Sequence, residues 1–310
     1  MASSKRKMAA AGASASVSAR VPVQDGAGPS VLHAPRKRRL SNRKASLFVA
    51  VAAVVVLVIV VVAGQLAAPS ALLADFDARN VSPCVQHPFG TDWMGRDMLL
   101  RTIAGLSTSV LVGLLAASVS AVIALVLASI AALGGRRADS VITWLVDLLM
   151  GIPHIVLLIL VSFAVGKGFW GVVVAVALTH WPSLTRVLRA EIMQCRESPF
   201  VAHAHKLGAS WPRIALKHMV PYVLPQFLVG LILLFPHAIM HEAAITFLGF
   251  GLPPEMPAIG VILSESMSYL SAGMWWLAAF PGIALVATVM LFDVAGSNVR
   301  RLVDPHSTQE

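Results

Sequence analysis

The chain has 310 residues, of which 57% are hydrophobic and 13% are charged, and its formal net charge is +9. Soluble domains are about half apolar and about a quarter charged, so this composition excludes an ordinary soluble globular protein. Most of the Lys and Arg residues lie outside the apolar runs. This distribution argues against a nucleic-acid partner and for the basic cytoplasmic flanks of a membrane protein.

The N-terminal segment is rich in Ala, Ser, Gly and basic residues. It predicts a disordered basic cytoplasmic tail over residues 1–45, although a transit peptide has a similar composition. The apolar run at 46–66 follows directly. Because it is longer than the apolar part of a signal peptide, about 7–15 residues, we expect it to remain attached as the first transmembrane helix.

Further apolar runs of about 20 residues are long enough to cross a hydrocarbon layer of about 30 Å. They predict membrane spans at 107–133, 141–165, 168–188, 222–240 and 274–294. Basic groups follow the second, fourth and sixth spans, so the positive-inside rule places both termini in the cytoplasm. We therefore predict an all-α polytopic membrane protein with six transmembrane helices, in contact with membrane lipid.

This topology divides the chain into an external loop at 67–106, a five-helix core at 107–305 and a short cytoplasmic tail at 306–310. Cys84 and Cys195 then lie on opposite sides of the membrane and cannot pair. With only these two cysteines, neither a disulfide framework nor a cysteine-based metal site is expected.

The cytoplasmic loop at 190–220 contains the polar stretch "SPFVAHAHKLGASWPRIALKHMVP". Ser198 followed by Pro199 predicts a helix start, and Gly208 predicts its left-handed end. Ser210 predicts the start of a second short helix, which we expect to end near Pro221.

One face of the first short helix is apolar. Phe200, Ala204 and Leu207 share it, and an exposed aromatic anchor beside a small residue suits a groove on a soluble partner. An amphipathic loop that lies on lipid is the alternative, and the residues alone leave both open.

The same stretch resembles the coupling loop of binding-protein-dependent ABC importer permeases, with the pattern E-A-A-x-x-x-G followed by a Pro. The matching positions are Ala202, His203, Ala204, Gly208 and Pro221. Ala202 stands where the family has Glu, and His203 stands where it has the first Ala. The resemblance implies that the loop contacts an ATPase. The implied contact residues are Phe200, Ala202, His203, Ala204, Leu207, Gly208 and Arg213.

Two further segments resemble dipeptide, oligopeptide and nickel permeases of the second-subunit type. "HPFGTDWMGRDMLLRTIAG" at 87–105 resembles their G-T-D-x-x-G-R-D-x-x-x-R segment, and "EAAITFLGFGLPPEMPAIG" at 242–260 resembles E-x-x-x-S-F-L-G-x-G-x-x-P-P. Asp147 and Pro153 resemble a D-x-x-x-x-x-P pattern in the third span. The resemblance covers roughly residues 46–305.

The resemblance implies a fold like that of type I ABC importer permeases, in a bacterial inner membrane. The implied substrate is a peptide, or nickel or another metal, free or chelated. The implied partners are a homologous second permease, two cytoplasmic ATPases and an extracytoplasmic substrate-binding protein. The sequence has no G-x-x-x-x-G-K-[ST] phosphate loop, so ATP is expected on the partner subunits, with no cofactor and no enzymatic activity in this chain.

Polar and conformationally special residues near the spans are candidates for the translocation path or its gate. They are Asp147, Pro153, His154, His180, Glu242 and Phe247. The external segment 247–254 is a candidate lid. Asp92, Arg96 and Asp97 are expected to form ion pairs in the external loop.

Histidines within the spans are candidates for metal handling. His237 and His241 are four residues apart, which places both imidazoles on one helix face, with Glu242 for charge balance. His154 and His180 are expected deeper, near the middle of their spans, as successive weak contacts. Packing residues that form hydrogen bonds within the bundle are the alternative. A zinc protease is excluded, because "HEAAI" lacks the second His of H-E-x-x-H.

A stand-alone secondary transporter or channel is the alternative function. Such proteins usually contain internal repeats with helices broken at matching positions. No matching halves are evident in this sequence, and such a carrier has no need of the capped cytoplasmic helix pair.

Overall fold

The computed structural model describes residues 40–303. Most of the predicted N-terminal tail and the predicted tail at 306–310 lie outside these residues. The described part is all-α and contains no strand, only an isolated bridge between Thr91 and Asp97. Its helices are α1 (Leu40–Ala71), η1 (Phe76–Ala78), α2 (Met98–Leu133), α3 (Gly135–Gly151), α4 (His154–Val165), α5 (Phe169–Arg196), α6 (Pro199–Lys206), α7 (Trp211–Ile214), the π-helical η2 (Ala215–Met219), α8 (Val220–Phe247), α9 (Ile259–Leu270) and α10 (Trp276–Val303).

Within residues 40–303, five helices are long and apolar enough to span a membrane, or six if the bent pair of α3 and α4 is one span. The all-α polytopic fold is therefore confirmed. The predicted third span at 141–165 is not straight, because α3 and α4 meet at an angle of 100°. Proline forces the residue before it towards extended backbone, and Ile152, before Pro153, has φ −90° and ψ 135°.

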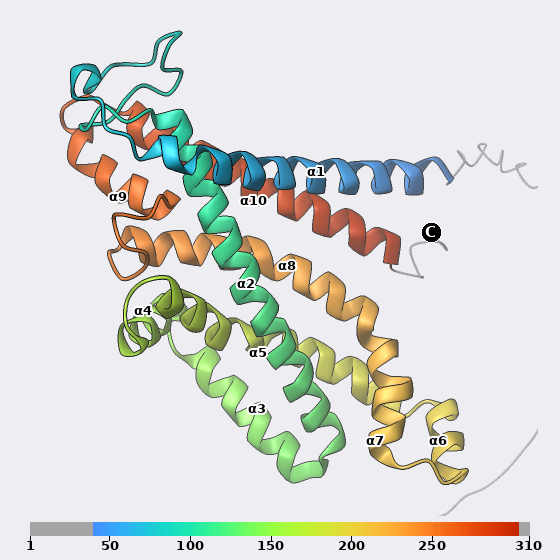
Figure 1. The fold of residues 1–310 in the computed structure, drawn as a ribbon. Helices are drawn as coiled ribbons and strands as arrows, with labels where there is room; N and C mark the ends of the chain where they lie inside the picture. Colours follow the sequence, from blue (N-terminus) through green and yellow to red (C-terminus); the bar gives the residue numbers. More distant parts are fainter. Residues whose placement is uncertain (1–39, 304–310) are drawn as a thin grey trace, which may run out of the picture. The chain divides into compact units, whose positions relative to one another are not determined.

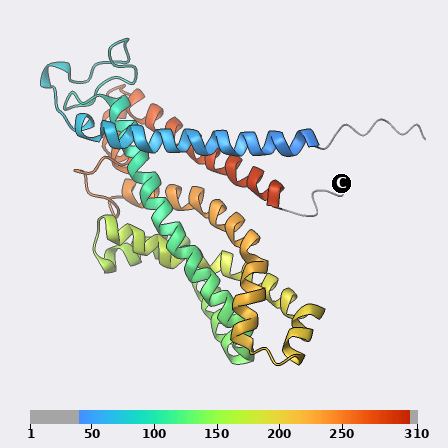
Figure 2. The ribbon, with the colours of Figure 1, turned by 45° about the vertical axis from the view of Figure 1, so that its right-hand side comes forward.

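Helix α2 is the central element of the described residues. It contacts α1, α5 and α8, while α1 also packs along α10 (Figure 1; Figure 2). Small residues make these approaches close: a Cβ on Gly64 of α1 would lie 2.4 Å from the Ile103 carbonyl oxygen of α2. The face of α2 in the main core carries a run of alanines. They are Ala116, Ala117, Ala121, Ala124, Ala128, Ala131 and Ala132. Small side chains at interfaces let membrane helices pack closely.

Several boundaries differ from the prediction. Helix α1 begins at Leu40, so residues 40–45 belong to a helix and not to a disordered tail. Helix α2 begins at Met98, not near 107, because the Asp97 carboxylate accepts hydrogen bonds from the Leu99 and Leu100 amides and fixes its first turn.

Two further differences concern the loops. The second cytoplasmic helix does not end near Pro221 but continues through η2 into α8. Proline lacks an amide hydrogen, and the π-helical turn directly before Pro221 changes the hydrogen-bond pattern at that point. The segment between the fifth and sixth predicted spans, for which no helix was predicted, contains the helix α9.

Candidate functional site

The external end of α2 is held by buried ion pairs. The Asp92 carboxylate lies 2.7 Å from Arg96 Nε and 2.6 Å from Arg101 Nη1. Both guanidinium groups also reach Glu265 of α9, at 3.2 and 3.0 Å. The predicted pairing of Asp92 with Arg96 is confirmed. Asp97 does not join this group, because it caps α2 and lies 2.8 Å from His87 Nδ1.

Sequence reasoning missed Arg101 and Glu265 in this group. Arg101 is the final Arg of the G-R-D-x-x-x-R pattern, so its spacing one turn beyond Asp97 was an available signal. No sequence signal pointed to Glu265, because the helix α9 itself was not predicted.

Hydrogen bonds hold the candidate lid at 247–254 against neighbouring segments. Ser162 Oγ donates to the Phe250 carbonyl oxygen at 2.8 Å, and Lys167 Nζ donates to the Gly249 carbonyl oxygen at 3.1 Å. A cavity of about 420 Å³ lies beside the segment. Its lining comprises Lys167, Gly168, Thr246, Gly249, Gly251, Leu252, Pro253, Pro254, Val261, Ser264 and Glu265. The lid therefore borders a cavity that the turn between α4 and α5, the end of α8 and the helix α9 also line.

Glu242 supports the base of this lid. Its side chain is fully buried, and its Oε1 accepts a hydrogen bond from Thr246 Oγ1 at 2.9 Å. The same hydroxyl oxygen accepts the Leu252 amide at 3.2 Å. Glu242 therefore orders the chain after α8. The predicted role of Glu242 in balancing the charge of a metal on His237 and His241 stays a prediction. Phe247, the other gate candidate here, is half-buried.

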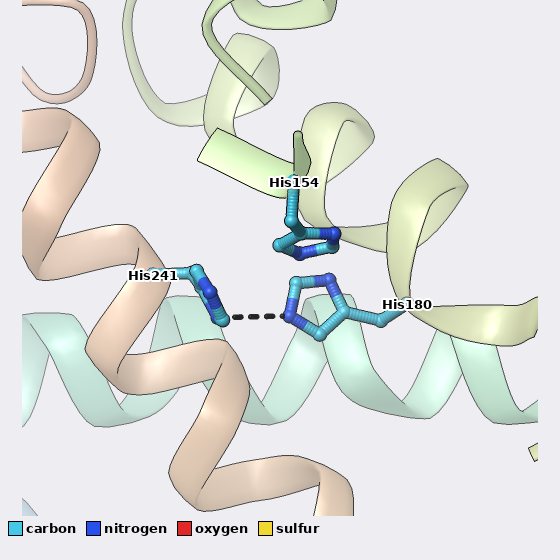
Figure 3. A group of neighbouring side chains, drawn as sticks. All are labelled: His154, His180 and His241. Atoms are coloured by element: carbon cyan, nitrogen blue, oxygen red, sulfur yellow. Dashed lines mark hydrogen bonds between the residues drawn. The ribbon is translucent and has the colours of Figure 1, made fainter. Parts of the chain in front are cut away.

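Three histidines from three helices meet inside the bundle (Figure 3). His154 begins α4, His180 lies in α5 and His241 lies in α8. One nitrogen of each lies within 4.8 Å of the others. The expected depth order is wrong, because His154 and His180 are at the level of His241. His237 is exposed and stands outside this group; only its carbonyl oxygen takes part, 2.7 Å from His241 Nδ1.

Asp147 of α3 faces α5. Its carboxylate forms an ion pair with Arg186, and both side chains are about half exposed. One turn further along α5, Arg189 pairs with Asp139 of α3, with Nη2 2.6 Å from Oδ2. A cavity of about 300 Å³ lies between the two pairs. Pro153, the other candidate near this region, is exposed at the break between α3 and α4.

The cytoplasmic helix pair forms much as predicted. Ser198 stands at the N-cap position, although its hydroxyl donates to the Cys195 carbonyl oxygen instead of capping the helix. Gly208 has φ +87° and ends the first short helix in the left-handed conformation. Ser210 precedes α7, as expected.

The pair packs against the bundle through one face only. Val201 and Ile214 are buried in the main core, and the Arg196 guanidinium carbon lies 4.9 Å from the Trp211 ring centroid. Phe200 is half exposed, and Leu207 is 88% exposed. The other predicted coupling residues are also at the surface or close to it. Ala202, His203, Gly208 and Arg213 are exposed, and Ala204 is half-buried.

Comparisons with known proteins agree with this architecture. Residues 122–309 match the model of a family described as the inner membrane component of binding-protein-dependent transport systems. A protein of Brucella suis biovar 1 that is named as a peptide permease is 36% identical over 236 residues, which cover 75% of this chain and 78% of that protein. The dipeptide transport system permease protein DppC of Bacillus subtilis is 30% identical over 227 residues, 73% of this chain and 71% of that protein.

A solved structure shares the fold. A chain of the MetNI methionine ABC transporter, in inward-facing conformations, superposes with a TM-score of 0.54 at 17% identity. The match covers 67% of this chain and 98% of the other.

Proposed function

Since the chain belongs to the family of inner membrane components of binding-protein-dependent transport systems, we propose that it forms one half of a transmembrane path for peptides. A homologous second permease supplies the other half. An extracytoplasmic binding protein delivers the substrate, and two ATPases on the cytoplasmic side supply the energy. Both termini lie in the cytoplasm, because the basic groups follow the second, fourth and sixth predicted spans.

The peptide substrate is supported by the names of the relatives, which are a peptide permease and a dipeptide permease. Nickel or another metal, free or chelated, is the alternative cargo. Nothing in the sequence similarity favours a metal, so we assign the transported class to short peptides.

The observation that carries the coupling role is the apolar surface of α6. Phe200 and Leu207 leave much of their apolar area exposed, while the opposite face of the pair is anchored through Val201 and Ile214. An exposed aromatic on an anchored helix and an exposed Leu directly after its last residue have the chemistry of a docking surface for a soluble protein. The departures at Ala202 and His203 remove the carboxylate that the family uses there. Contact with the ATPase therefore rests on the apolar side chains.

Uptake of radiolabelled dialanine into cells tests the proposal. Cells that lack this chain should lose uptake, and the wild-type chain should restore it. The Leu207→Ser variant should restore less than a tenth of it, whereas Val85→Ser should restore it fully. Val85 is a matched control, because it is an apolar side chain that is 99% exposed in the external loop. A deletion that leaves peptide uptake unchanged but abolishes nickel uptake would overturn the substrate assignment. Uptake that survives loss of the ATPase subunits would favour a stand-alone carrier.

A further inference from the structure

The three histidines at the break of the α3–α4 pair have no role in the docking surface or the lid. Their rings are packed edge to face, with centroids 4.6 Å apart for His154 and His180, 4.5 Å for His154 and His241, and 5.0 Å for His180 and His241. They come from α4, α5 and α8, which are distant in sequence (Figure 3). A convergence of three imidazoles from three elements is a specific arrangement that the fold has to build.

Backbone carbonyl groups determine which nitrogens carry protons. His180 Nδ1 lies 3.0 Å from the Val176 carbonyl oxygen, and His241 Nδ1 lies 2.7 Å from the His237 carbonyl oxygen. Because a carbonyl oxygen only accepts, both Nδ1 atoms donate to it. In the neutral imidazoles each Nε2 then carries a lone pair. His241 Nδ1–H also points at His180 Nε2 at 3.2 Å, so it is shared between that nitrogen and the His237 carbonyl oxygen, and a metal ion on His180 Nε2 would replace the longer of these two hydrogen bonds.

The third ring adds an atom that needs a partner. His154 Nε2 is buried and has no hydrogen-bond partner among the described residues. Buried polar atoms in proteins are nearly always satisfied, so an unpartnered His154 Nε2 beside the Nε2 atoms of two further imidazoles points to a shared ligand.

We propose that His154, His180 and His241 bind one divalent transition-metal ion. Imidazole nitrogen is a preferred ligand of zinc, nickel and copper. In a tetrahedral site with bonds of about 2.0–2.1 Å, two ligand nitrogens lie about 3.3 Å apart. The three nitrogens, already within 4.8 Å of one another, reach this spacing with small side-chain rotations.

The surroundings match those of known metal-binding histidines. Such histidines almost always donate their other ring N–H to a carbonyl group or a carboxylate, which orients the ring, and Val176 and His237 supply this carbonyl here. Calcium and magnesium bind oxygen ligands, so an all-nitrogen set disfavours them. Three protein ligands leave at least one position for water or another small ligand.

The ion would connect α4 and α5 to α8, which lies much further along the chain. His154 follows the break at Pro153, so the metal ties α4 to α5 and α8 at the point where the span changes direction. This site differs from the pair expected from spacing, because His237 contributes only its carbonyl oxygen. It also does not depend on which substrate the protein transports.

Metal binding to the purified full-length chain tests the proposal directly, with an affinity tag that contains no histidine. Zn²⁺ bound after dialysis is measured by mass spectrometry, and Co²⁺ reports nitrogen coordination through its visible absorption. We expect one tightly bound Zn²⁺ per wild-type chain. His154→Ala, His180→Ala and His241→Ala should each lower the affinity at least tenfold.

His237→Ala is the matched control, because it keeps the carbonyl oxygen that orients His241 and should bind Zn²⁺ as the wild type does. Circular dichroism and gel filtration check that each variant is folded. His154→Ala is the variant least expected to disturb the fold, because the loss of His154 Nε2 breaks no hydrogen bond. Zn²⁺ should raise the Tm of the wild type and of His237→Ala, and leave that of His154→Ala unchanged. Equal Zn²⁺ binding by the wild type and His154→Ala, or equal loss in His237→Ala, would overturn the proposal.

Discussion

The loop between α1 and α2 and the helix pair α6–α7 between α5 and α8 differ in how far their polar and apolar side chains find partners within the chain. The loop between α1 and α2 pairs its charges within the chain, with Asp92 and Arg101 almost fully buried, and the lid is held by hydrogen bonds to α4 and to the turn between α4 and α5. The cytoplasmic helix pair buries one face and leaves Phe200 and Leu207 exposed. A region whose charged and polar groups are paired within the chain keeps a fixed conformation. A region that leaves large apolar side chains exposed has the surface expected of a protein-binding site. The difference supports the proposal that the helix pair α6–α7 is the docking region.

The largest expected effect is at the external ion pairs. Replacing Arg101 with Met leaves the buried Asp92 with one cation fewer, and breaking a buried pair typically costs about 3–5 kcal/mol. We expect a large fall in Tm and in the yield of folded protein in detergent. Asp77→Ala, an exposed change in the same loop, should have no measurable effect. If the two variants have equal Tm values, the external loop is not held by this cluster.

A smaller effect is expected at the base of the lid. Glu242→Ala removes the acceptor of the Thr246 hydroxyl and leaves a cavity, which costs about 1–3 kcal/mol. Glu242→Gln keeps a carbonyl oxygen at that position and should stay close to wild type in Tm and in peptide uptake. If Glu242→Gln abolishes uptake while the protein remains folded, the carboxylate acts in transport itself and not only as support for the lid.

Backbone strain at the cytoplasmic turn should have a smaller effect on stability but a specific effect on function. Gly208 has φ +87°, so Gly208→Val strains the turn by about 1 kcal/mol or more. Peptide uptake and ATPase stimulation should then fall together, while membrane insertion persists. Gly135 is a matched control, because it has φ +82° and equally open surroundings in the turn between α2 and α3. Gly135→Val should keep both peptide uptake and ATPase stimulation. Equal loss of uptake in both variants would contradict a specific role of the turn after α6 in coupling.

The sidedness of the two regions can be tested without any change in stability. Cys84 is exposed in the external loop and should react with a membrane-impermeant maleimide in intact cells. A Leu207→Cys substitution in a Cys84→Ser background should react only after the membrane is permeabilised. Labelling of Leu207→Cys in intact cells would contradict the topology.

Much of this architecture followed from sequence. Apolar run length and basic flanks predicted the spans, and the residues Ser198, Gly208 and Ser210 predicted the short helix pair, because caps and left-handed turns are local. The 100° break at Pro153 did not follow, because proline can kink, end or merely interrupt a helix and the packing of α4 on α5 decides between these outcomes.

Tertiary contacts account for the other errors. The i, i+4 spacing predicted that His237 and His241 would act together, but α8 turns His241 towards His180 and leaves His237 exposed. Sequence spacing describes neighbours on one helix. The partners of His241 come from α4 and α5, whose approach depends on the small residues and the bend in the bundle.

Copurification tests most directly the proposal that the exposed side chains of Phe200 and Leu207 dock the ATPases. The tagged chain is coexpressed with the second permease and the ATPase subunits, solubilised, and the ATPase that it retains is quantified. Wild type and Val85→Ser should retain equal amounts, whereas Leu207→Ser and Phe200→Ser should each retain less than a tenth as much, with the second permease still bound. Full retention of the ATPase by both Leu207→Ser and Phe200→Ser would contradict docking through these side chains.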